Sequence, residues 1–265
     1  MTDNARNRDS GIDTMQQRGD SVIHCHDCVL SVGDGVWEFA RDSAAAIDRH
    51  WARRRIESPA MFNGVIHLMD RLRVVQEGAA APVLEGQFLR TDFKSYLYWR
   101  EIGFPAAGVR DAFGSALIRA AEGHVVLGRQ RPGNVNNGAA YLPGGFIDPQ
   151  DVTADGRIDI DGSILRELRE ETGLEPGEVA VQPGYLVTFD GALLSMAREL
   201  RSALPADELR GRILAHIAND PRSELVDAVI IRSAGEADDA SIHPYARRLL
   251  RWLLGGEARG ASTMR

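Results

Sequence analysis

Cysteines and long apolar runs are scarce in this chain of 265 residues. The two cysteines, Cys25 and Cys28, cannot staple a fold of this size, which indicates a reducing compartment. No run approaches the roughly 18 apolar residues of a membrane-spanning helix. The first residues, from Met1 to Arg6, are polar. We therefore expect no secretory signal, no membrane span and a cytoplasmic protein.

Basic residues are outnumbered, with 31 against 38 acidic ones and a net charge of -7. Lys94 is the only lysine, a bias that we attribute to genomic composition. An acidic surface argues against binding to a nucleic-acid duplex, because such binding depends on contacts with phosphates. It does not argue against a small anionic substrate, since a bound cation or a local basic pocket reverses the field.

Hydrophobic periodicity predicts a tail and two units. Residues 1–20 lack any period and are expected to form a flexible tail. In residues 21–105 we expect a small α+β domain, with strands at 21–32, 65–75 and 82–90 and helices at 36–57 and 91–103.

Residues 106–265 are expected to form the second domain. Strand patterns lie at 109–119, 124–131, 179–189, 193–200 and 224–232, and helices at 163–172, 206–219 and 243–254. Their irregular order indicates a mixed α/β or α+β sandwich rather than a doubly wound parallel sheet. One face of the last helix is apolar, which suits either packing inside the domain or a homodimer contact; we expect packing inside.

Three carboxylates point to chemistry in the segment 142–174. Glu167, Glu170 and Glu171 are spaced i, i+3 and i+4, so they share one face of a helix that ends at Gly173. Like charges in this arrangement repel one another, unless a hard cation such as Mg²⁺ lies against them. Arg166, four residues before Glu170, is placed to hold that carboxylate.

A glycine pair precedes this helix. Gly144 and Gly145 offer backbone without side chains, so the chain is able to approach a phosphate or a metal ion closely. A metal beside a polyphosphate suggests attack by an activated water on phosphorus.

This segment resembles the Nudix box, whose pattern is G-x5-E-x7-R-E-U-x-E-E-x-G-U, where U is a bulky aliphatic residue. The chain matches it fully from Arg166 to Leu174. Two departures precede the match. Asp151 stands where the family has Glu, and residues 152–165 number 14 where the family has seven. We expect the acidic, turn-rich insert to bulge outward.

The resemblance implies a Nudix α/β/α sandwich with a mixed sheet, preceded by the small N-terminal domain. It further implies that Glu167, Glu170 and Glu171 ligate Mg²⁺ or Mn²⁺. The reaction implied is hydrolysis of a nucleoside diphosphate linked to another group, X. A non-catalytic nucleotide-sensing protein of the same fold is the alternative.

A weaker resemblance concerns the first hundred residues. Trp51, the string 61–64 (MFNG) and the string 91–100 (TDFKSYLYWR) look like the N-terminal domain of the Nudix branch that hydrolyses UDP-glucose and UDP-galactose. This likeness implies UMP and a sugar 1-phosphate as products. ADP-ribose or a dinucleotide such as NADH is the alternative substrate, because fold does not choose substrate. The alternative reading of the strings is core packing.

Further residues are candidates for substrate contact or proton transfer. Arg129 and Arg131 precede the loop that contains Asn137 and have the planar fork that suits a diphosphate. With Lys94, these three complete the residues that we expect to bind the substrate. Glu224 is the favoured general base, because it opens a strand where an acid has no packing reason; Glu171, Glu199 and Asp190 are alternatives.

The C-x-x-C of Cys25 and Cys28 has two interpretations. It would supply half of a structural zinc site in an interaction module, but no second cysteine pair exists to complete that site. We favour buried strand residues.

Overall fold

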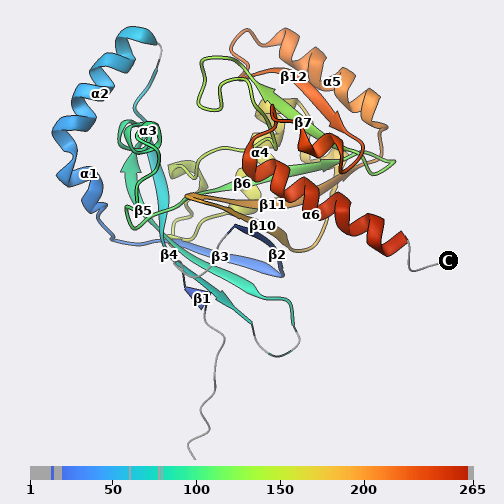
Figure 1. Cartoon of the computed structure of the whole chain (residues 1–265), viewed down its shortest axis with the longest axis horizontal. Helices are drawn as coiled ribbons and strands as arrows, with labels where there is room; N and C mark the ends of the chain where they lie inside the picture. Colours follow the sequence, from blue (N-terminus) through green and yellow to red (C-terminus); the bar gives the residue numbers. More distant parts are fainter. Residues whose placement is uncertain (1–12, 15–19, 60, 77, 79, 262–265) are drawn as a thin grey trace, which may run out of the picture.

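The larger of two β-sheets is mixed and carries helices on both faces (Figure 1). The computed structural model describes residues 13–14, 20–59, 61–76, 78 and 80–261. The strands of this sheet are β2 (Ser21–Cys25), β6 (Asp111–Arg119), β7 (Val125–Gln130), β8 (Ala140–Tyr141), β9 (Val179–Val181), β10 (Tyr185–Asp190), β11 (Leu193–Ser202) and β12 (Leu225–Ile231). Their order is β12-β7-β6-β11-β10-β2, with β8 on β7 and β9 on β11. Only the β6–β11 pair is parallel among these described strands.

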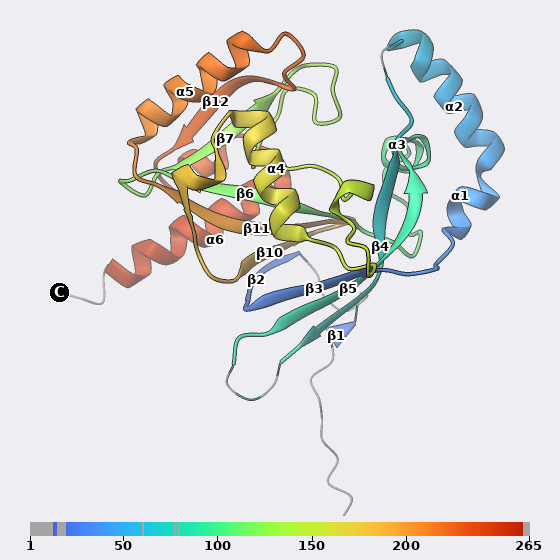
Figure 2. The same cartoon turned by 180° about the vertical axis from the view of Figure 1, so that it is seen from behind.

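Three helices complete the sandwich. They are α4 (Ile160–Thr172), α5 (Ala206–Asn219) and α6 (Pro244–Ala261). The helices α4 and α5 contact each other on one face of the sheet, while α6 lies on the opposite face, as the front and back views show (Figures 1 and 2). Leu249 and Leu250 of α6 are fully buried. The expected α/β/α sandwich and the inward packing of the last helix are confirmed.

A smaller sheet and three helices precede the sandwich. The strands are β1 (Asp13–Thr14), β3 (Asp27–Val32), β4 (Val65–Val75) and β5 (Val83–Asp92), in the order β1-β4-β5-β3. The helices are α1 (Glu38–Asp42), α2 (Ala44–Glu57) and α3 (Phe93–Glu101). Asp92 caps α3 by accepting a hydrogen bond from the Ser95 amide at 3.1 Å. Apart from β1 and Asp20, the predicted tail lies outside the described residues.

Three segments predicted to be continuous are interrupted. The strand expected at 21–32 breaks at His26, because its halves pair with different sheets: β2 with β10, and β3 with β5. The helix expected at 36–57 divides at Ser43 into α1 and α2. The strand expected at 179–189 breaks between β9 and β10, where Pro183 lacks an amide proton and Gly184 has a φ of 76°.

The insert before α4 does not bulge outward as expected. It turns back along the open edge of β3, where the Val32 amide donates to the Gly156 carbonyl at 2.9 Å and the Ile158 amide donates to the Leu30 carbonyl at 3.0 Å. Ile158 is only 6% exposed. The remaining inserted residues start α4 one turn early, at Ile160. The insert therefore ties α4 to the smaller sheet.

Backbone hydrogen bonds also join the two sheets directly. Met69 of β4 exchanges two of them with Arg110, and the His67 amide donates to the Ile147 carbonyl at 2.8 Å. Among the described helices, none combines the length and apolar character needed to cross a bilayer. Cys25 ends β2 and Cys28 lies in β3; both are buried and neither forms a disulfide.

Candidate active site

Helix α4 presents its acidic face because its apolar face is fixed against the sheet. Ile164 is fully buried over β6, where Gly114 leaves room for it: a Cβ atom there would lie 2.6 Å from Ile164 Cγ1. Asp159 caps the first turn, and Gly173 ends the helix with a φ of 71°. This packing directs the three glutamates of the box toward the loop that follows β8.

Glu171 is the most deeply buried of the three. Its Oε1 accepts a hydrogen bond from the Tyr141 hydroxyl, and its Oε2 accepts one from the Gly144 amide at 2.9 Å. Burial raises the pKa of Glu171 well above its usual range, and the nearby charges of Glu167 and Glu224 raise it further. The protein thus holds this carboxylate in one orientation at a considerable electrostatic cost.

Arg166 holds the outer carboxylates. It donates to Glu167 Oε1 at 2.8 Å and to both oxygens of Asp151, at 3.0 and 3.2 Å, and it lies 3.5 Å from Glu170 Oε2. Asp151, which replaces the family's Glu, is 4% exposed and keeps the ion pair despite its shorter side chain. The expected contact between Arg166 and Glu170 is present.

The remaining carboxylates repel one another. Burial raises the pKa of Glu167 to about 7, which the charge of Arg166 opposes and the charge of Glu170 increases. Burial also raises the pKa of Glu224, which precedes β12 and receives a hydrogen bond from Gln130. Glu167, Glu171 and Glu224 therefore act on one another electrostatically, and Arg166 offsets the charge of Glu167.

Both glycines of the loop are required by close contacts. A Cβ atom on Gly144 would lie 2.2 Å from a backbone carbonyl oxygen of β6, and one on Gly145 would lie 2.5 Å from Glu167 Oε1. The first glycine lets the loop pack on the sheet, and the second leaves space for the carboxylate.

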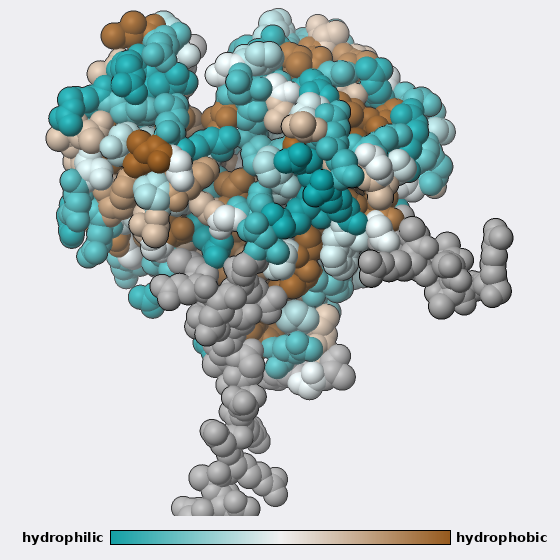
Figure 3. Space-filling model, viewed as in Figure 1, coloured by the Kyte–Doolittle hydropathy of each residue, from teal (hydrophilic) through white to brown (hydrophobic). Residues whose placement is uncertain are grey.

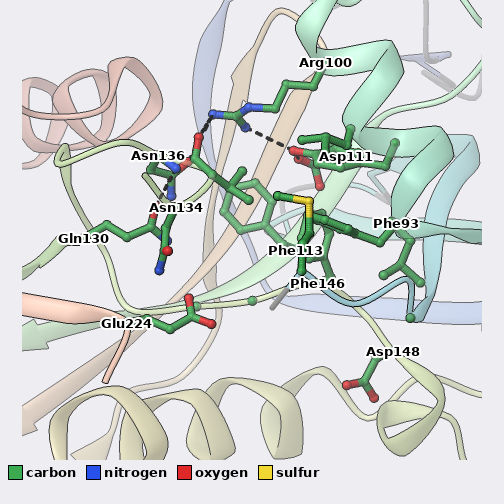
Figure 4. A pocket seen from close by; sticks show the side chains of 18 of the residues that line it. Phe93, Arg100, Asp111, Phe113, Gln130, Asn134, Asn136, Phe146, Asp148 and Glu224 are labelled. Carbon is green, nitrogen blue, oxygen red and sulfur yellow. Dashed lines mark hydrogen bonds between the residues drawn. The ribbon is translucent and has the colours of Figure 1, made fainter. Parts of the chain in front are cut away.

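A cavity of about 1170 Å³ opens from this cluster toward the N-terminal helices. Its lining includes Gly145, Glu167 and Glu170 on one side, and Phe93 and Arg100 of α3 on the other. The surface is hollowed between the lobe of α2 and the lobe of α5 and β12 (Figure 3). In the close view, Glu224 and Asp148 lie near α4, while Arg100 and Asp111 lie across the cavity (Figure 4).

Four residues expected to bind substrate are not in this lining. Arg129 donates to the Gly138 carbonyl at 3.1 Å, and Arg131 donates to the Ser223 carbonyl at 3.2 Å. Asn137 accepts from the Gly133 amide. Lys94 pairs with Asp48 at 2.6 Å on the outside of α3. Of the alternative bases, Asp190 pairs with Arg248 and Glu199 with Arg201, both outside the lining.

Other lining residues were not predicted as site residues, although Arg100 stands in the string 91–100 that resembles the UDP-sugar branch. Asp111 begins an apolar strand, Arg100 ends a helix, and His243 precedes α6, so nothing local connects them. Asp111, an acid inside the strand predicted at 109–119, was the one available hint for that residue.

The sandwich, its acidic helix and the adjoining glycine loop define a hydrolase with an acidic, cavity-facing active site. The chain belongs to the NUDIX domain family: the model of the NUDIX domain matches residues 108–253, more than half of the chain. It is thus a Nudix-type hydrolase. No curated protein sequence matches the chain.

The solved structures that are similar to this chain include Nudix proteins. The Nudix hydrolase RenU of M. smegmatis is 17% identical, with a TM-score of 0.39 over 59% of this chain and 88% of its own. The MutT protein of Methanosarcina mazei Go1 is 20% identical, with a TM-score of 0.34 over 59% and 96%. Similarities of this size do not distinguish one substrate from another.

Proposed function

We propose that this protein hydrolyses the diphosphate bond of a nucleoside diphosphate linked to a group X, with Mg²⁺ or Mn²⁺ as cofactor. The observation that carries the proposal is the presence of Glu167, Glu170 and Glu224 in the wall of a cavity that would hold a nucleotide, with the buried Glu171 close enough for the charges of Glu167 and Glu224 to raise its pKa. Carboxylates that raise one another's pKa require positive charge nearby to stay ionised together. Arg166 supplies a single positive charge against several carboxylates.

The donor set suits a divalent cation. Mg²⁺ and Mn²⁺ prefer carboxylate oxygens, and Glu167, Glu170 and Glu171 would hold the ion. Within the described part of the chain, no three acidic, histidine or cysteine side chains converge on one point as they stand. The Glu170 side chain is 52% exposed and has room to turn toward its neighbours. When bound, the cation neutralises phosphate charge and lowers the pKa of a water molecule.

The chain's own residues divide the remaining work. Arg166 keeps Glu167 in place through its bond to Asp151, and Gly145 leaves room for that carboxylate. We assign the proton-accepting role to Glu224 rather than Glu171. Both oxygens of Glu171 already accept hydrogen bonds from the protein, whereas Glu224 lies at the cavity and its raised pKa suits a base.

A UDP-sugar is our first choice of substrate. The strings that resemble the UDP-sugar branch border the cavity, since Phe62, Gly64, Phe93, Tyr96 and Arg100 all line it. ADP-ribose or NADH is the second choice, and a nucleotide sensor without turnover is the third.

The test is phosphate release from UDP-glucose, UDP-galactose, ADP-ribose and NADH in Mg²⁺ or Mn²⁺, with a coupled phosphatase. Wild type is compared with Glu171→Gln and with a matched control, Glu208→Gln, on the exposed first turn of α5. We expect turnover of UDP-glucose that is lost in Glu171→Gln and kept in the control. Turnover of ADP-ribose or NADH alone would show that the UDP-sugar is the wrong substrate but would leave the proposed mechanism unchanged. No turnover with retained nucleotide binding would favour the sensor.

A further inference from the structure

A polar recess lies across the cavity from α4. We define it by Arg100, Asp111, Asn136 and His243, which come from four separate segments and all line the cavity. Arg100 links them. It donates a hydrogen bond to Asn136 Oδ1 at 3.2 Å and another to the Tyr96 hydroxyl, which in turn donates to Asp111. The charge of Arg100 also acts on His243. Figure 4 shows Arg100, Asp111 and Asn136 together, opposite Glu224.

Asp111 gives the recess a negative charge. The side chain is 4% exposed, and its Oδ2 accepts the Tyr96 hydroxyl at 2.7 Å. Within the described residues, no partner is recorded for Oδ1. A carboxylate accepts hydrogen bonds and repels anions. Asp111 therefore favours a neighbouring group that donates hydrogen bonds, while the charge of Arg100 offsets its own.

Donors surround this acceptor. Arg100 is held by the Tyr96 hydroxyl, the Val135 carbonyl and Asn136, bonds that use three of the five N–H groups of a guanidinium. Because Oδ1 of Asn136 faces Arg100, its NH₂ group is left to donate. The Nδ1 atom of His243 has no partner within the described structure, and burial with the charge of Arg100 lowers its pKa to about 4, so the ring is neutral.

The aromatic rings near the recess line the cavity and are packed against one another in edge-to-face pairs. Phe146 meets Tyr96 edge to face at 4.7 Å, and Phe113 meets Tyr245 in the same way at 5.2 Å. An exposed aromatic face lies instead at another part of the lining, where Phe62 is 78% exposed. A nucleobase would stack there, since stacking needs a free ring face.

We propose that the polar recess binds X, and that X is an uncharged, hydroxylated group of the sugar class. A sugar hydroxyl both donates and accepts, which matches a carboxylate set among a guanidinium, an amide and a neutral imidazole. The assignment deepens the proposed hydrolysis and rests on it for the meaning of X. It places the diphosphate at α4 and the nucleoside toward Phe62.

The test measures binding rather than turnover. Glucose 1-phosphate and UMP are titrated separately into wild type and Asp111→Asn by calorimetry in Mg²⁺. Asparagine keeps an oxygen for the Tyr96 hydroxyl but loses the charge. We expect the Kd of glucose 1-phosphate to rise at least about tenfold, or about 1.4 kcal/mol, with the Kd of UMP within twofold. The exposed control Asp207→Asn on α5 should change neither.

Arg100→Met provides a second test, with the same expected selectivity, in case Asp111→Asn does not fold. The proposal is overturned if wild type does not bind glucose 1-phosphate. It is also overturned if the variants weaken the binding of UMP alone, weaken the binding of both ligands equally, or change neither. Turnover of the nucleotide panel is measured on the same preparations. Selective loss of glucose 1-phosphate without turnover would refute only the hydrolysis, and turnover without selective loss would refute only the recess.

Discussion

Replacing Glu167 by Gln should reveal the cost of the carboxylate cluster as a pH-dependent change in stability. The folded protein raises the pKa of Glu167 from its usual 4.5 to about 7. Below pH 4.5 Glu167 is protonated in both the folded and the unfolded protein, so its ionisation does not affect stability. As the pH rises toward the higher value, the unfolded chain releases its proton first, so wild type loses stability relative to Glu167→Gln.

The size of this effect follows from the shift. A difference of about 2.5 pKa units corresponds to about 3 kcal/mol, at about 1.4 kcal/mol per unit. About 2 kcal/mol of it falls between roughly pH 5.5 and 8.5. At roughly 2–4 °C per kcal/mol for a chain of this length, the melting temperatures should diverge by about 4–8 °C over that range.

The assay is thermal unfolding of wild type, Glu167→Gln and the control Glu208→Gln across this range of pH in chelator. Wild type and the control should lose stability together, while Glu167→Gln loses less. Adding Mg²⁺ at pH 8 should stabilise wild type more than Glu167→Gln, because a cation bound to the folded protein offsets the repulsion between the carboxylates. Parallel curves for all three proteins would refute the electrostatic account of the cluster.

Four further substitutions test the surroundings of the cluster. Gly144→Ala should reduce the free energy of unfolding, measured in urea, by about 3 kcal/mol, because the new Cβ atom meets backbone. Gly145→Ala should reduce it by about 1 kcal/mol and should lower kcat/KM at least about tenfold, because its Cβ atom displaces the Glu167 side chain. Equal losses of stability in the two variants would contradict this difference. Tyr141→Phe removes a hydrogen bond that lowers the pKa of Glu171. Because Glu171 would hold the metal ion only when it is ionised, the acid limb of the pH–kcat/KM profile should move to higher pH. An unmoved limb would exclude this role of Glu171. Asp151→Ala removes the carboxylate that binds the partly buried guanidinium of Arg166 through both oxygens, and it should destabilise the protein by about 3 kcal/mol in the same urea assay. An unchanged midpoint would count against the ion pair.

The elements that sequence predicted best are those decided by local pattern. The bounds of β4 and α5 match the predicted ranges 65–75 and 206–219 at both ends, because turn residues flank each periodic run. The break at His26 was beyond such reasoning. It depends on two partner strands, β5 and β10, that lie far away in the chain.

The candidate site divides in the same way. Helical spacing alone placed Glu167, Glu170 and Glu171 on one face, and Arg166 beside them. The polar recess could not be predicted, since Arg100 and His243 are brought together only by the packing of α3 and α6 around the sheet. Arg100 stands in the string that resembles the UDP-sugar branch, but no local pattern connects it with His243.

The sharing of one strand between the two units has a consequence for how the chain can be divided. β2 belongs to the N-terminal segment, yet it pairs along Tyr185–Phe189 at the border of the larger sheet. A shortened chain that starts at residue 106 would leave this row of backbone donors and acceptors without partners, an open edge on which other chains can add. The N-terminal segment therefore supplies the last strand of the hydrolase's sheet as well as part of its cavity wall.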